Sequence, residues 1–280
     1  MDSLISTSWL EAELGAPDLR VIDATFFLPA DGRDARAEYE SEHIPGAVFL
    51  DLGEVSDSDN PAPHMIPTEH KFASRMQSLG LGDGNRFIVY DNSPWHSAAR
   101  IWWMLRIFGA HHVALLDGGL QKWKAEGRPL KSGTPQVRHG HFTPMLDDKA
   151  VADKEQVRVL VGGDSHAIVD ARSAVRFAGE EGEPRPGLAS GHIPGSLNLP
   201  QSRLFEADNR WKRGEALRAE FDKAGVDLGK PMVTTCGSGV TAAVLLFGAH
   251  LLRKDDVTLY DGSWSEWGAD PSTPKATGAA

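Results

Sequence analysis

Cysteine is nearly absent from this sequence, which has one, Cys236, among its 280 residues. A single cysteine excludes an intramolecular disulfide and a metal site built from several thiolates. Long apolar runs are also missing, and none approaches the roughly 20 residues that a membrane-spanning helix requires. We therefore expect a soluble protein with no membrane partner, in which any thiol chemistry belongs to Cys236.

Positive charge is in short supply as well. Lys and Arg number 29 against 39 Asp and Glu, which gives a net charge of -10, and the basic residues are scattered along the chain. Because nucleic acids are bound through clustered positive charge, we expect no nucleic-acid partner. The first residues also lack the basic start and apolar core of an export signal, so we expect a cytoplasmic location.

The sequence repeats itself in two halves. SEHIPGA at 41–47 recurs as SGHIPGS at 190–196, and LDGG at 116–119 recurs as YDGS at 260–263. Each copy contains short apolar runs separated by helical patterns, which is typical of strands buried on both faces of a parallel sheet. We predict an α/β fold with two tandem domains, each a mostly parallel sheet flanked by helices. The predicted bounds are 1–130 and 154–280, with a Gly- and Pro-containing linker at 131–153.

Cys236 lies between a strand candidate at 231–235 and an apolar helix candidate at 241–252. The loop reads Cys-Gly-Ser-Gly-Val-Thr, and its two glycines allow several backbone N–H groups to face one atom. The start of the helix adds positive potential, so a thiolate is stabilised there. A buried, inert cysteine is the alternative. The first copy has Asp91 at the corresponding place, followed by a loop that contains Pro94, so we predict that this copy is inactive.

These features together resemble the two-domain rhodaneses: two copies of His-Ile-Pro-Gly, a late Asp-Gly-Gly or Asp-Gly-Ser, and a cysteine loop in the second copy alone. The resemblance implies a sulfurtransferase that carries sulfur as a persulfide on Cys236. The family members that use thiosulfate have basic residues after the cysteine, whereas those that use 3-mercaptopyruvate have Cys-Gly-Ser-Gly-Val-Thr, as here. The resemblance therefore implies transfer of sulfur from 3-mercaptopyruvate, with release of pyruvate.

Three other functions would use parts of the same pattern. A thiosulfate:cyanide sulfurtransferase is disfavoured by Gly237 and Ser238, which replace the basic residues. A catalytically idle rhodanese-like binding module would not require an intact cysteine loop. A related phosphatase would need an arginine six positions after the cysteine to hold phosphate, and this position is Ala242.

The resemblance also implies which residues meet the substrate. Arg176 and Arg185 would hold the donor's carboxylate, since a guanidinium binds a carboxylate through two hydrogen bonds. Ser238 and His43 would assist proton transfer, although each also suits a turn, and His192 has the same motif as His43. The remaining loop residues would line the substrate site: Gly237, Gly239, Val240 and Thr241. We expect no metal and no organic cofactor, and we expect a thiol, a thioredoxin-like protein or cyanide to accept the sulfur.

Overall fold

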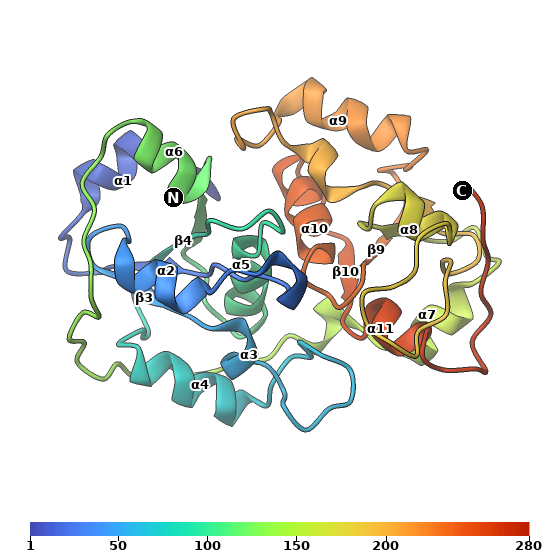
Figure 1. The fold of residues 1–280 in the computed structure, drawn as a ribbon, viewed down its shortest axis with the longest axis horizontal. Coiled ribbons are helices and arrows are strands. Elements are labelled where there is room, and N and C mark those ends of the chain that lie inside the picture. Colours follow the sequence, from blue (N-terminus) through green and yellow to red (C-terminus); the bar gives the residue numbers. More distant parts are fainter. Residues whose placement is uncertain (280) are drawn as a thin grey trace. The chain divides into compact units, whose positions relative to one another are not determined.

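The computed structural model describes residues 1–279, which form two compact units (Figure 1). Unit 1 comprises residues 1–57, 66–147 and 207–211. Unit 2 comprises residues 58–65 and 148–206, and continues from Lys212 to the end of the described chain. Each unit thus includes a short segment flanked by residues of the other. The predicted domain bounds stay a prediction.

Unit 1 contains a five-stranded sheet in the order β1-β5-β4-β2-β3, in which every neighbouring pair is parallel. The strands are β1 (Leu4–Ile5), β2 (Leu19–Asp23), β3 (Ala47–Phe49), β4 (Arg86–Tyr90) and β5 (Val113–Leu116). The helices are α1 (Thr7–Glu13), α2 (Ala35–Ser41), α3 (Leu52–Val55), α4 (Glu69–Ser78), α5 (Ala98–Ile107) and α6 (Gly119–Ala125), with a 3-10 turn at Pro29–Asp31.

Unit 2 contains a second five-stranded parallel sheet in the order β6-β10-β9-β7-β8. Its strands are β6 (Val151–Ala152), β7 (Ala167–Asp170), β8 (Leu197–Asn198), β9 (Met232–Thr235) and β10 (Val257–Tyr260). Its helices are α7 (Lys154–Leu160), α8 (Ala174–Ala178), α9 (Gly214–Lys223), α10 (Ala242–Leu251) and α11 (Ser263–Trp267), with 3-10 turns at Asp148–Ala150 and Gln201–Leu204.

The two sheets have the same strand order, counted from the first strand of each unit, so the sequence repeat is a structural repeat. Two parallel sheets with flanking helices confirm the predicted fold class. In unit 2 the central strand β9 is buried along its whole length, and α10 packs on β9 and β10, as Figure 1 shows in orange and red. The predicted inactivity of the first copy stays a prediction. No helix among residues 1–279 has the length and apolar character needed to cross a membrane.

The repeated His-Ile-Pro-Gly motif forms the same turn in both units. In unit 1 the Ala47 N–H donates to the Ile44 carbonyl at 3.0 Å, and Gly46 has a φ of 79°. In unit 2 the corresponding hydrogen bond joins the Ser196 N–H to the Ile193 carbonyl, also at 3.0 Å, and Gly195 has a φ of 78°. A positive φ after proline defines a type II turn, which favours glycine at that place. The turn leads directly into β3 or β8.

Candidate functional site

Cys236 directly follows β9, the central strand of the second sheet, and precedes α10. The side chain is buried, with 2% of its surface exposed. Gly239 has a φ of 77°, a backbone conformation that a larger residue would adopt only with strain, and it lets the loop curl before the helix. The thiol therefore lies at the carboxyl end of a parallel strand and the start of a helix, where open α/β sheets place ligands and where negative charge is favoured. Val240 is also buried, and Thr241 lies at the helix start.

The cysteine loop is held in place by the start of α11. The Ser263 hydroxyl accepts from the Cys236 N–H at 3.2 Å and the Gly239 N–H at 3.1 Å, and it donates to the Tyr260 carbonyl at 2.8 Å. Ser263 is fully buried and has a φ of 48°. Ser265 contacts the same loop, since its hydroxyl donates to the Gly237 carbonyl at 2.6 Å. The Asp-Gly-Ser motif at 261–263, noticed in the sequence as a repeat, thus supports the cysteine loop.

Arg176 lies on α8 and reaches the cysteine loop. A Cβ atom added to Gly237 would lie 3.2 Å from Arg176 Nη2, so the absence of a side chain at 237 leaves room for the guanidinium. Arg176 Nη2 also donates to Glu183 Oε2 at 2.5 Å. The sequence predicts that Arg176 acts together with the cysteine loop. The structure shows that the two are neighbours in unit 2.

Arg185 also lies beside the loop. Its Nη1 donates to the Ser265 hydroxyl at 3.2 Å, and that hydroxyl is bonded to the carbonyl of Gly237. Burial lowers the pKa of Arg185, while the negative charge of a Cys236 thiolate acts in the opposite direction. A partly desolvated guanidinium close to the thiol is suited to bind an anionic substrate.

Ser238 contacts a histidine that the sequence analysis did not identify. Its hydroxyl lies 2.9 Å from Nδ1 of His64. His64 belongs to the segment 58–65 of unit 2, has a φ of 63°, and is 174 positions away from Ser238 in sequence. No repeat or periodic pattern marks this segment, so nothing in the sequence linked the two residues.

His43, which the sequence analysis assigned to proton transfer, is buried in unit 1. Its Nδ1 lies 2.8 Å from the Tyr39 carbonyl, and its ring stacks on Tyr39 at 4.3 Å. His192 has matching contacts in unit 2, with Nδ1 2.8 Å from the Phe177 carbonyl and its ring stacked on Phe177 at 3.8 Å. Both histidines also pair through their backbones with the segment that ends each copy, at Lys131 and Ala276. The shared contacts favour a turn-fixing role, and the catalytic role of His43 stays a prediction.

The first copy has a carboxylate where the second has the thiol. Asp91 follows β4, and its carboxylate accepts from the Ser93 N–H at 3.1 Å and the Ala98 N–H at 2.6 Å. Burial raises the pKa of Asp91 to about 7. Gly119 corresponds to Ser263, and a Cβ atom there would lie 2.5 Å from the Asp91 carbonyl. In unit 1 the Asp91 carboxylate itself accepts hydrogen bonds from the N–H groups of its loop. In unit 2 the Ser263 hydroxyl accepts the hydrogen bonds from the cysteine loop.

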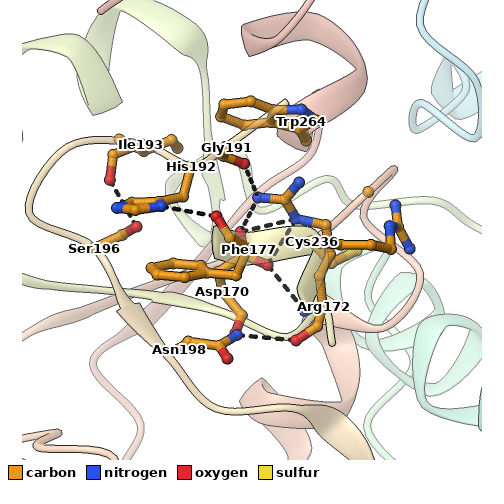
Figure 2. A network of polar contacts seen from close by, with 12 residues as sticks. Asp170, Arg172, Phe177, Gly191, His192, Ile193, Ser196, Asn198, Cys236 and Trp264 are labelled. Atoms are coloured by element: carbon orange, nitrogen blue, oxygen red, sulfur yellow. Dashed lines mark hydrogen bonds and ion pairs between the residues drawn. The ribbon is translucent and has the colours of Figure 1, made fainter. Parts of the chain in front are cut away.

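A buried ion pair lies at the carboxyl end of β7, the strand next to β9 in the sheet (Figure 2). Arg172 and Asp170 are each 1% exposed in their side chains, and Arg172 Nη2 lies 2.6 Å from Asp170 Oδ2. Figure 2 shows the Arg172 guanidinium between Asp170 and the ring of Trp264, whose centroid is 4.6 Å from Arg172 Cζ. Within residues 1–279, no group of three or more His, Cys, Asp or Glu side chains could hold a metal ion.

The fold is a duplicated parallel α/β fold with a cysteine at the carboxyl end of a strand in its second copy, and a thiolate at such a place is a nucleophile that can carry a group. The model of the Rhodanese-like domain matches residues 6–126 and 153–270, and the chain belongs to the rhodanese family.

Relatives and solved structures cover nearly the whole chain. The chain is 42% identical over 271 residues to a human 3-mercaptopyruvate sulfurtransferase, covering 95% of this chain and 91% of the relative. It is 40% identical over 272 residues to a thiosulfate sulfurtransferase from Cricetulus griseus, again covering 95% and 91%. The crystal structure of SseA from Escherichia coli, a 3-mercaptopyruvate sulfotransferase, matches with a TM-score of 0.87 and 38% identity, covering 95% of this chain and all of that one.

Proposed function

We propose that this protein is a 3-mercaptopyruvate sulfurtransferase that carries sulfur as a persulfide on Cys236. The observation that carries the proposal is the loop Cys236–Thr241 at the start of α10, with Arg176 and Arg185 beside it. The thiol is suited to attack sulfur, and the two guanidinium groups are suited to hold a carboxylate. Relatives that match nearly the whole chain have this activity in their names.

The first half-reaction forms the persulfide. The Cys236 thiolate attacks the sulfur of 3-mercaptopyruvate, so that a sulfur–sulfur bond forms and the carbon–sulfur bond breaks. The electron pair of the broken bond passes into the enolate of pyruvate, which takes up a proton and leaves as pyruvate. Arg176 and Arg185 hold the carboxylate, and the loop residues Gly237, Gly239, Val240 and Thr241 surround the reacting sulfur.

Proton transfer in this step is assigned to Ser238 and His64. A hydroxyl 2.9 Å from an imidazole nitrogen is within the distance at which one group can take a proton from the other. The hydroxyl is suited to donate to the enolate oxygen, and the imidazole to accept or return the proton. His64 takes the place that the sequence analysis gave to His43, since the contacts of His43 are those of a turn residue.

The second half-reaction returns the enzyme to its thiol form. A nucleophile attacks the outer sulfur of the persulfide, and Cys236 leaves as a thiolate. A small thiol, a thioredoxin-like protein and cyanide all have the chemistry to accept sulfur in this way. The cytoplasmic location expected from the sequence stays a prediction.

Thiosulfate is the alternative donor, and a relative with 40% identity is named a thiosulfate sulfurtransferase. The loop argues against it. Thiosulfate is a dianion and benefits from positive charge next to the thiol, whereas this chain has Gly237 and Ser238 there. An idle binding module would not need the buried thiol, the bonded loop and the two arginines together.

The test compares two donors in parallel. Pyruvate release from 3-mercaptopyruvate and thiocyanate formation from thiosulfate with cyanide are measured as initial rates, with Cys236→Ser as the control. We expect a large preference for 3-mercaptopyruvate that is lost in the variant. A preference for thiosulfate would refute the choice of donor, and no Cys236-dependent transfer from either donor would favour the binding module.

A further inference from the structure

Glu183 lies between two arginines of unit 2. Its Oε1 accepts from Arg172 Nη1 at 2.7 Å, and its Oε2 accepts from Arg176 Nη2 at 2.5 Å. The Glu183 side chain is 2% exposed and that of Arg172 is 1% exposed, while Arg176 is 16% exposed. A buried carboxylate thus joins a buried guanidinium to one that reaches the surface of the site.

Arg172 anchors this chain of charges to the sheet. Its Nε and Nη2 donate to the carboxylate of Asp170, the last residue of β7, and Nη2 also donates to the Gly191 carbonyl at 2.8 Å. The planar guanidinium also lies over the Trp264 ring. With so many fixed partners, Arg172 cannot turn, and it holds Oε1 of Glu183 in one place.

Glu183 determines which edge of Arg176 faces the substrate. A guanidinium has two edges that can each hold a carboxylate. Nε and Nη2 of Arg176 face Glu183, at 3.4 and 2.5 Å, which turns the edge formed by Nη1 and Nη2 toward another carboxylate. Nη2, which the two edges share, is also the atom nearest to a Cβ built on Gly237, so this second edge begins at the cysteine loop.

The residue that anchors Glu183 is an arginine in unit 2, which has the thiol, and a different residue stands at its place in unit 1. Asp23 of unit 1 corresponds to Asp170, and each accepts from the backbone N–H two residues later, at 2.9 Å. That residue is Arg172 in unit 2 but Thr25 in unit 1, which has no guanidinium to extend the chain. The shared aspartate therefore belongs to the fold, and the arginine added to it belongs to the site.

We propose that Glu183 is a positioning residue that orients Arg176 for the donor's carboxylate, with Arg172 as its anchor. The proposal rests on the proposed function, in which Arg176 binds that carboxylate. Glu183 touches neither the thiol nor the reacting sulfur in this scheme, and acts through Arg176.

When Glu183 is neutralised, the orientation of Arg176 and the charge of the site predict opposite changes in the binding of an anionic substrate. Arg172 and Arg176 are balanced by Asp170 and Glu183, so Glu183→Gln leaves one positive charge in excess. If charge alone mattered, an anionic substrate would bind more tightly to the variant. If orientation matters, Arg176 gains rotational freedom and the anion binds more weakly.

The experiment uses Glu183→Gln and Glu183→Asp in the full chain. The aspartate keeps the charge but is shorter by about 1.5 Å, so it cannot reach both arginines. We expect KM for 3-mercaptopyruvate to rise about tenfold in both variants, with kcat within about threefold of the parent protein. An unchanged or lower KM in the aspartate variant would overturn the proposal, because that variant isolates geometry from charge.

A second measurement does not depend on the sulfur donor. Cys236 is alkylated with iodoacetate, which carries a carboxylate, and with iodoacetamide, which is uncharged and of similar size. We expect the rate with iodoacetate divided by the rate with iodoacetamide to fall about fivefold in both Glu183 variants. An unchanged or higher ratio would refute the orientation of Arg176. If the parent protein releases no pyruvate from 3-mercaptopyruvate, the proposed function fails, while this ratio still decides the role of Glu183.

Glu220→Gln is the matched control. Glu220 is a similarly enclosed carboxylate of unit 2 on α9, 9% exposed in its side chain, and it forms ion pairs with Arg203 and Lys212, which precede that helix. Its loss should lower the melting temperature without raising KM or changing the alkylation ratio. Equal changes in KM for the Glu220 and Glu183 variants would show a general loss of stability and would overturn the positioning role.

Discussion

Replacing Ser263 by alanine tests how the cysteine loop is held. The Ser263 hydroxyl accepts from the N–H groups of Cys236 and Gly239 and donates to the Tyr260 carbonyl. The residue is fully buried, so water cannot take the place of the hydroxyl. In Ser263→Ala, two buried N–H groups and one carbonyl therefore each lose a hydrogen bond.

The expected loss follows from these three hydrogen bonds. Each contributes about 1 kcal/mol net, so Ser263→Ala should lower the free energy of unfolding of unit 2 by about 3 kcal/mol. Ser263 has a φ of 48°, which is strained for any residue except glycine. Ser263→Gly relieves roughly 1 kcal/mol of this strain, so its loss should be about 2 kcal/mol. Ser196→Ala is the matched control, since this buried serine donates one hydrogen bond, to the Ile193 carbonyl.

Urea unfolding followed by tryptophan fluorescence measures these losses, and the rate of pyruvate release from 3-mercaptopyruvate measures the effect on the loop. We expect the order of stability to be parent, Ser196→Ala, Ser263→Gly and Ser263→Ala, with sulfur transfer slowed in the two Ser263 variants alone. If Ser263→Ala were no less stable than Ser196→Ala, the three hydrogen bonds would not hold the loop as described. A Ser263→Gly variant less stable than Ser263→Ala would refute the account of backbone strain.

Two further predictions concern the buried carboxylate of the first copy and the serine–histidine contact of the second. Burial raises the pKa of Asp91 from 3.8 to about 7, so the folded protein binds this proton more tightly than the unfolded chain does. The resulting stability is complete below about pH 4 and is lost as the pH rises through 7, by an amount of order 4 kcal/mol. Urea unfolding between pH 4 and 8 should show a flatter dependence for Asp91→Asn, and parallel curves would contradict this. Ser238→Ala and His64→Ala should each lower kcat for pyruvate release about a hundredfold, and the double variant should lose no more, because the pair acts as one unit. Losses that multiply would show that the two act separately.

The place of the cysteine loop between a strand and a helix could be predicted because its residues lie close together in sequence. Cys236 and the glycines of its loop are consecutive, and the change from strand to helix around them is visible in the apolar pattern. The repeat added a comparison within the chain, since Asp91 stands where the second copy has the thiol.

The histidines show a contact that sequence reasoning did not reach, while the catalytic role of His43 stays a prediction. His43 belongs to a repeated motif and was therefore noticeable, but repetition itself reflects a turn that both copies need. His64 belongs to no motif, and it contacts Ser238 across 174 positions of sequence.

The sequence by itself determined the α/β class, the duplication and the place of Cys236 between a strand and a helix, because each depends on neighbouring residues and on local backbone preferences. Only the tertiary structure decided that Ser263 holds the cysteine loop, that His64 meets Ser238, and that Glu183 joins Arg172 to Arg176. These contacts depend on how parallel strands bring distant loops to one edge of a sheet. A hydrogen bond requires atoms within about 3 Å, and such a distance between remote residues is decided by packing.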